Sequence, residues 1–501
     1  MTSVRPTFEP TPCITHQFQV DTLRSEENIW TAILSCPAGF PVDIFEAATS
    51  QLIDHPEYNS TLILRSETLE EADFDFPEVT PTFEGLRKTR FIHRKLLARR
   101  PGRDAPLEQY CTLYSSQEGS LAADTLVLTP IVDPGSALPY YHPSVHHLAF
   151  RYVHSQPPEL RIEVLPLPET ATDINGRLYR TCLALLETLH RYGWGAVTNY
   201  KKRVQHDCLV PREAYQDLYL IMRERHKHLV ATWQEVTDPL KHVFEDIGIA
   251  TFLMLLWKDT FPSEDTTTAS DSSLTEPWKA WPRPPSGFLD FGCGNGLLTH
   301  ILIAEGYLGF GIDLRARTSW THYPQTTQDA LRVHSFEPIP EAHPPSESYL
   351  KPGVFIIGNH ADELTPWLPV VSTIYNASGY LSIPCCAWAF DTKYDRASTP
   401  LYDTSSDDFT ESLNLGGDGT NKSSYSMYRI WLASLSLHCG WEVECETLRI
   451  PSTRNWALIG RRRLQVPSHQ EAMMNANTIL SDVKMRGVFK ARKPEGKAGD
   501  H

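Results

Sequence analysis

The stretch GFLDFGCGNGLLTHILIAEGYLGFGIDLR, residues 287–315, decides the fold of the second half of the chain. FLDF is a short apolar run typical of a buried strand, and glycines follow it at positions 292, 294 and 296. LLTHILIAE then predicts a helix that ends before Gly306, and GFGID predicts a second strand. The segment is therefore expected to form a strand–turn–helix–strand unit, the opening of a doubly wound parallel sheet.

The spacing of these glycines indicates which kind of ligand the turn holds. A dinucleotide fold prefers GxGxxG, whereas this turn reads GxGxG. Asp313 ends the second strand, where a carboxylate can accept hydrogen bonds from two ribose hydroxyls, and Asp290 can serve a cationic amino group. We therefore predict S-adenosylmethionine; a glycine-rich turn of another α/β protein and a nicotinamide enzyme are the alternatives. The expected contacts come from Asp290, Gly292, Cys293, Gly294, Asn295, Gly296, Asp313 and Asn359.

A polar segment follows the next predicted strand. The apolar run VFIIG, residues 354–358, precedes Asn359, His360, Asp362 and Glu363. Ligands collect at the carboxyl ends of parallel strands in open α/β sheets, so this segment is expected to face the methyl group and its acceptor. A polar helix cap is the alternative.

Further elements complete the sheet. We expect a weakly marked third strand near 332–336, a fifth strand in YLSIPCCAWAF, a helix over 425–439 and an antiparallel pair in WEVECETLRIPSTRNWALIGRR. Arg449, Arg454 and Asn455 near its turn are candidates for contacts with the acceptor. Cys385 and Cys386 have no base beside them in the sequence, which favours packing over a nucleophilic role.

The first half carries strands and helices but no chemical motif. Strands are predicted at 61–65, 125–132 and 147–153, and helices at 177–192, 213–236 and 239–258. Residues 87–103 hold eight Lys and Arg and no acid. This stretch is either a solvated helix face or a stripe that contacts phosphates.

We expect an N-terminal α+β region over residues 1–165 and a helical region with a linker over 166–275. The methyltransferase domain is expected over 276–464, with a mobile insertion at about 395–424. A basic, disordered tail is expected over 465–501.

Composition narrows the function classes. The chain has 501 residues and a net charge of −15, which argues against a general nucleic-acid coat protein but not against an RNA enzyme. Ten cysteines without zinc-type spacing and an amino terminus without an apolar core predict a reduced, intracellular compartment and no metal. The most apolar run, Ile249–Trp257, is too short to span a membrane.

Six segments together resemble the eukaryotic tRNA (uracil-O2′-)-methyltransferases, which methylate the ribose of uridine at position forty-four of serine tRNA. They span residues 195 to 460, roughly, and read YKKRVQHD (200–207), TDPLKHVFEDIGIATFLMLLW (237–257), FLDFGCGNGLLTHILIAEGYLGFGIDLRARTSW (288–320), GNHADELTPWLP (358–369), IPCC (383–386) and LRIPSTRN (448–455). The resemblance implies a class I, Rossmann-like S-adenosylmethionine-dependent methyltransferase that acts on tRNA in the cytoplasm.

The sequence thus predicts a tRNA ribose 2′-O-methyltransferase that forms 2′-O-methyluridine. Asp362 or His360 is the candidate base for the ribose hydroxyl, because both follow the fourth strand. The candidate tRNA contacts are Lys201, Lys202, Arg203, Arg454 and Asn455. A methyltransferase acting on a protein or a small molecule is the main alternative, and a binding module without catalysis is the other.

Overall fold

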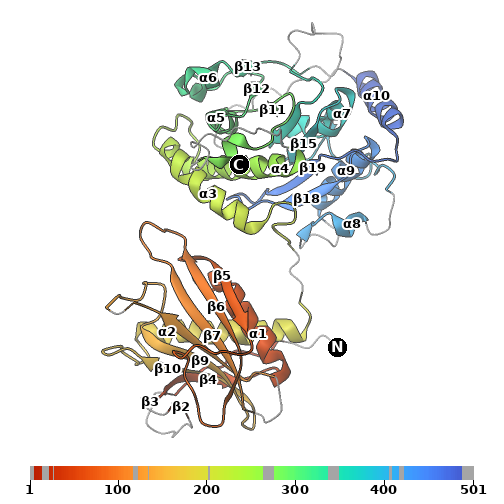
Figure 1. Cartoon of the computed structure of the whole chain (residues 1–501). Helices are drawn as coiled ribbons and strands as arrows, with labels where there is room; N and C mark the ends of the chain where they lie inside the picture. The colour runs from red at the N-terminus through yellow and green to blue at the C-terminus, as the bar shows by residue number, and fades with distance from the viewer. Residues whose placement is uncertain are drawn as a thin grey trace. The chain divides into compact units, whose positions relative to one another are not determined.

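The computed structural model describes residues 5–13, 22–25, 28–116, 122–133, 135–200, 204–262, 276–336, 349–404, 409–416 and 423–487. The chain divides into two compact units, Met1–Lys201 and Lys202–His501 (Figure 1). The helical region that we expected over 166–275 is therefore shared between the two units.

The first unit is an antiparallel sheet with two helices on one face. The strands lie in the order β1-β4-β10-β9-β8-β7-β6-β5. Strands β2 and β3 form a separate two-stranded sheet. Apolar side chains of α1 and α2 pack on the sheet to form the core of the unit. The predicted strands at 61–65, 125–132 and 147–153 correspond to β5, β8 and β9. The bounds are β1 Thr11–Pro12, β2 Arg24–Ser25, β3 Asn28–Ile29, β4 Thr31–Pro37, α1 Phe45–Asp54, β5 Ile63–Ala72, β6 Arg87–Ala98, β7 Leu107–Ser115, β8 Thr125–Ile131, β9 Val145–Val153, β10 Glu159–Pro166 and α2 Arg177–Val197.

Two predictions for the first unit are wrong. The basic stretch is not a helix face but strand β6, in which Phe91, Leu96 and Ala98 turn apolar side chains into the core. Helix α2 does not stop at Gly193 but continues for one more turn. The glycine is needed there for packing, since a Cβ atom at Gly193 would lie 2.0 Å from the ring of Phe40.

The second unit is built on a seven-stranded sheet in the order β13-β12-β11-β14-β15-β19-β18. The strands from β13 to β15 are parallel, and β19 and β18 are antiparallel to their neighbours. All strands predicted from 288 onward are present, with the third at Leu331–Val333. The bounds of the seven strands are β11 Phe288–Phe291, β12 Gly309–Asp313, β13 Leu331–Val333, β14 Phe355–Asn359, β15 Gly379–Ile383, β18 Glu444–Thr447 and β19 Trp456–Gly460. Strands β16 Trp388–Ala389 and β17 Thr392–Lys393 form a separate two-stranded pair.

Helices cover both faces of this sheet (Figure 1). Apolar residues of α3, α4 and α5 pack on one face, and those of α7, α9 and α10 pack on the other. The bounds are α3 Arg212–His226, α4 Pro239–Thr260, α5 Leu297–Ala304, α6 Gln325–Gln328, α7 Trp367–Ile374, α8 Phe409–Ser412, α9 Ser424–His438 and α10 His469–Arg486.

Two helices of this unit differ from prediction. Helix α3 ends at His226, so it is shorter than the predicted 213–236, and a 3-10 helix over Lys227–Val230 follows it. Beyond that, the indole of Trp233 donates to the carbonyl oxygen of Thr237 in the turn that leads to α4. Where we expected a disordered tail, α10 packs Ile479 and Val483 into the core. It begins with a capping box between Ser468 and Glu471, which satisfies backbone donors at its first turn.

Helix α4 contains the apolar run Ile249–Trp257, and this run is buried. Among the described helices, none is long and apolar enough to cross a membrane.

Candidate active site

The glycine turn between β11 and α5 has the backbone that only glycine adopts readily. The φ angles of Gly292, Gly294 and Gly296 are 84°, 54° and 74°. A Cβ atom at Gly296 would lie 2.8 Å from Leu331, so this position also requires close packing. A Cβ at Gly294 would meet nothing within 4 Å, so the turn is open at its middle. The open position is where a ligand can approach the backbone.

Side chains around the turn hold it in place. The Gly294 amide donates to Asp313 Oδ2 at 2.9 Å, and the buried indole of Trp320 donates to the Gly294 carbonyl at 3.0 Å. Cys293 donates its amide to Ile312 at 3.0 Å. Asn295 Oδ1 accepts from the Leu297 amide at 2.9 Å, so this predicted ligand contact serves the start of α5. Asp313 retains acceptor capacity for a ribose.

Asp290 lies at the end of β11, with only 2% of its surface exposed. Thr299 Oγ1 donates to its Oδ2 at 2.8 Å. Burial, together with the charge of Asp313, raises the pKa of Asp290 to about 7. A cation beside this carboxylate would restore its ionised form.

Two acids on α4 reach the same edge of the sheet, and sequence reasoning missed both. Asp246 is buried, and its Oδ1 accepts from Asn359 Nδ2 at 3.2 Å. Burial raises the pKa of Asp246 well above its ordinary value, and the charges of Glu245 and Asp290 add to this. Among the described ion pairs, none involves Asp246 or Asp290. The signal was present as two adjacent acids just before the apolar run Ile249–Trp257.

The neighbouring acid, Glu245, pairs with His360 at the end of β14. His360 Nε2 lies 3.0 Å from Glu245 Oε1. Burial alone would raise the pKa of Glu245, but the hydrogen bonds from His360 and Ser452 hold it below its ordinary value. Ser452 belongs to the IPSTRN segment, so three segments distant in sequence meet at this pair. A histidine held by a carboxylate is suited to accept a proton.

Two polar atoms at the end of β14 are covered from solvent and have no hydrogen-bond partner among the described residues. They are Oδ1 of Asn359 and Nδ1 of His360. An unpaired buried polar atom costs free energy, on the order of 1–3 kcal/mol. These atoms are therefore places where a ligand that donates hydrogen bonds would stabilise the structure.

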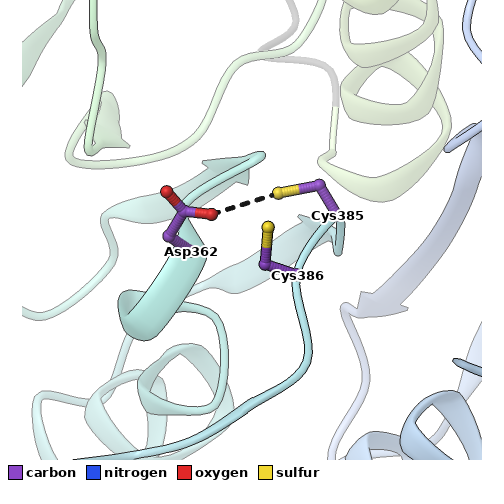
Figure 2. Close-up of side chains that lie close together, drawn as sticks. All are labelled: Asp362, Cys385 and Cys386. Atoms are coloured by element: carbon purple, nitrogen blue, oxygen red, sulfur yellow. Dashed lines mark hydrogen bonds between the residues drawn. The ribbon is translucent and has the colours of Figure 1, made fainter. Parts of the chain in front are cut away.

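The other predicted base, Asp362, makes a different contact. Its Oδ1 accepts from the thiol of Cys385 at 3.3 Å, and Cys386 lies beside them (Figure 2). His360 and Asp362 both have positive φ angles, 53° and 46°. The two predicted bases contact separate partners, Glu245 for His360 and Cys385 for Asp362. The hydrogen bond between the two thiols lowers the pKa of Cys386 and raises that of Cys385.

The residues predicted to contact the acceptor lie in different surroundings. Arg454 is exposed, and its guanidinium stacks over Tyr425 at 3.8 Å from the ring centre. Asn455 Nδ2 donates to the Leu448 carbonyl at 2.9 Å, which closes the turn between β18 and β19. Arg449 is paired with Asp207 at 2.7 and 2.5 Å. Lys201, Lys202 and Arg203 lie outside the described residues.

The basic stretch in β6 is largely paired within the first unit. Arg90 forms an ion pair with Glu46, and His93 lies 3.1 Å from Glu108. Arg94 is buried and donates to Gln109. These side chains are engaged in the fold, which weakens the interpretation of the stretch as a phosphate-contacting stripe.

Comparison with known proteins gives consistent matches over both units. Residues 8–203 match a family model described as "TRM44-like, N-terminal bet v1-like domain". Residues 209–276 and 272–338 match one described as "Predicted AdoMet-dependent methyltransferase", which implies S-adenosylmethionine as the methyl donor.

Several curated relatives are named tRNA (uracil-O(2)-)-methyltransferase. The relative from Schizosaccharomyces pombe is 35% identical over 469 residues, covering 87% of this chain and 86% of the relative. The relative from Neurospora crassa is 33% identical and covers 87% of both chains. The relative from Saccharomyces cerevisiae is 30% identical, covering 83% of this chain and 84% of the relative. No solved structure matches the chain.

Proposed function

The chain belongs to the tRNA (uracil-O(2)-)-methyltransferase family, and from this premise we propose that it methylates the ribose 2′-hydroxyl of a uridine in serine tRNA, at position forty-four. The observation that carries the proposal is the Glu245–His360 pair at the carboxyl end of β14, next to the buried carboxylates of Asp246 and Asp290. As the family resemblance implies, the proposal places the reaction in the cytoplasm.

The proposal includes a class I, Rossmann-like domain. Five parallel strands, a switch in strand order between β11 and β14, and helices on both faces support a doubly wound sheet. In such sheets ligands bind outside the carboxyl ends of the strands at the switch point. Asp313 and Asn359 are the last residues of β12 and β14, and Asp290 is the next-to-last residue of β11, all at this edge.

The residues present fit S-adenosylmethionine, which supplies a methyl group on a cationic sulfonium. Asp290 and the neighbouring Asp246 form a buried acidic site for the amino group, and the unpartnered Asn359 Oδ1 adds an acceptor. Asp313 would hold the ribose hydroxyls, and the open backbone at Gly294 would allow close approach.

His360 is the proposed catalytic base. Glu245 takes the Nε2–H of the ring, and this leaves the lone pair on Nδ1 to receive the proton of the ribose hydroxyl. The hydroxyl, or one bridging water, must reach Nδ1 inside the site. Glu245 acts as a positioning residue, because it fixes the tautomer and the ring orientation. Asp362, the alternative base, is engaged by Cys385.

Alignment of hydroxyl and methyl donor would supply much of the remaining rate. Arg454, stacked on Tyr425, is the proposed contact to the tRNA among the described residues. Lys201, Lys202 and Arg203, which lie outside the described residues, remain proposed contacts to the tRNA. Among the described residues, no contact favours a protein or small-molecule acceptor over tRNA.

The test is methylation of serine tRNA transcripts by the purified full chain with a labelled methyl donor. We expect label in 2′-O-methyluridine at position forty-four, and no product from a transcript carrying 2′-deoxyuridine there. Label on a base, or undiminished transfer to the deoxy transcript, would contradict ribose methylation. Label on a different ribose would overturn the position but keep the chemistry.

A further inference from the structure

Asp362, Cys385 and Cys386 form a cluster that the proposed proton transfer does not use. They follow the ends of two adjacent parallel strands, β14 and β15 (Figure 2). One ligand atom from each residue lies within 4.8 Å of the other two. Within the described part of the chain, no other set of three His, Cys, Asp or Glu side chains has this spacing.

We propose that this cluster binds one zinc ion through both thiolates and the Asp362 carboxylate, with water as the fourth ligand. On binding, the two thiols release two protons, and two Zn–S bonds and one Zn–O bond form. The ion, two thiolates and one carboxylate then carry a net charge of −1. No oxidant or reductant is needed, because zinc does not change its redox state.

The observed spacing is close to that of a tetrahedral zinc site. Zn–S bonds of about 2.3 Å place two sulfurs about 3.8 Å apart, and a sulfur and an oxygen about 3.5 Å apart. The Cys385 sulfur already lies 3.3 Å from Asp362 Oδ1. The remaining separations are all within 4.8 Å, so they require shifts of at most about 1.3 Å, within the reach of side-chain rotation.

The chemistry of the three groups selects the ion. Thiolates bind zinc and other thiophilic ions, whereas Mg²⁺ and Ca²⁺ prefer oxygen ligands alone. All three residues are partly exposed, so an ion and a water molecule can reach them.

The ligand set explains why the sequence predicted no metal. The two cysteines are adjacent rather than in a CxxC pair, and the third ligand lies on the neighbouring strand end. Only the parallel pairing of β14 with β15 brings them together. The inference does not depend on the role of His360, and its test does not use catalysis.

The experiment uses the full chain, stripped of metal by a chelator and kept reduced with a phosphine. Zinc and cobalt are titrated separately, with bound metal measured per chain and the cobalt–thiolate absorption recorded. We expect one tightly bound ion per chain and a cobalt–thiolate band. Absence of the band or of stoichiometric zinc would overturn the proposal.

Variants locate the site. We expect Cys386→Ser and Asp362→Asn to weaken binding by at least about tenfold, by analogy with the loss of metal-site partners. Cys208→Ser is the control, because Cys208 is exposed and lies outside the cluster. Equal affinity in Cys386→Ser and wild type would contradict the assignment.

Thiol alkylation of the wild-type chain tests the site without variants that could misfold. Zinc should protect two thiols from alkylation, and peptide mapping should identify them as Cys385 and Cys386. Protection of other cysteines instead would overturn the site even if zinc binds.

Discussion

Strand β6 of the first unit and the β14 edge of the second unit differ in how their ionisable side chains are paired. In β6, Arg90 is paired with Glu46, and Arg94 is held by Gln109 and by backbone carbonyls. At the β14 edge, Asp246 and Asp290 are buried and, among the described residues, have no cation as an ion-pair partner. Charges that are paired within the fold stabilise it, whereas carboxyls buried without a counter-ion are held toward their neutral form, and a bound cation would restore their charge.

The largest expected effect is on the rate of methyl transfer. His360→Ala should lower kcat by about 10²- to 10⁴-fold, the usual contribution of a general base, while the affinity for the cofactor stays near that of wild type. Single-turnover methylation of tRNA measures the rate, and calorimetry measures the affinity. His469→Ala is the matched control, because His469 is exposed at the start of α10.

Substitutions of Glu245, the partner of His360, should lower kcat by graded amounts. Glu245→Gln should lower kcat with little change in KM for tRNA, and Glu245→Asp should recover part of the loss. A purely structural role would instead lower thermal stability in proportion to activity in both variants. Parallel losses of this kind would remove Glu245 from the mechanism.

Cofactor affinity should depend on the buried carboxylate of β11. Asp290→Asn removes a charged hydrogen-bond acceptor, a loss of about 1.5–3 kcal/mol, and should weaken S-adenosylmethionine binding by about 10- to 150-fold. Equilibrium titration measures this. An affinity within twofold of wild type would show that Asp290 does not bind the amino group of S-adenosylmethionine.

The raised pKa of Asp290 predicts a pH dependence with a defined sign. A carboxyl with an unfolded pKa of about 3.9 and a folded pKa of about 7 holds its proton in the folded state, so the ligand-free chain should lose stability as pH rises between these values. Cofactor affinity should rise over the approach to pH 7, because the ionised form binds the cation. Thermal melts with and without cofactor, across pH, test both trends, and Asp290→Asn should flatten them.

The smallest effect should come from β6. Arg90→Ala breaks a partly exposed ion pair and should cost about 0–1 kcal/mol of stability. Methylation of tRNA at saturating substrate should change by less than about twofold. A large increase in KM for tRNA, without loss of stability, would restore the interpretation of this stretch as a phosphate-contacting surface.

The comparison also explains which features the sequence could predict. The glycine turn, Asp290 and Asp313 lie within one continuous stretch, and local pattern was enough to place them. Glu245 and Asp246 lie on a helix far upstream, and only packing of α4 against β14 brings them to the edge. Asn455 stays a predicted contact to the acceptor, and the hydrogen bond from its amide to the Leu448 carbonyl within the turn could not be read from the sequence.

Strand β6 was misread for a related reason. Lys and Arg occur on both faces of the strand, so its alternation of buried and exposed residues is hidden in the sequence. Arg94 is buried because Gln109 and the carbonyls at the end of α1 receive its donors. Sequence pattern does not reveal such long-range partners.

The most direct test of the account is a crystal structure of the full chain with S-adenosylhomocysteine, the demethylated cofactor. The account predicts the ligand at the carboxyl ends of β11, β12 and β14, with its amino group about 3 Å from an oxygen of Asp290 or Asn359 and its ribose hydroxyls about 3 Å from Asp313. The ligand bound elsewhere, or with its amino group turned away from the buried carboxylates, would contradict the account.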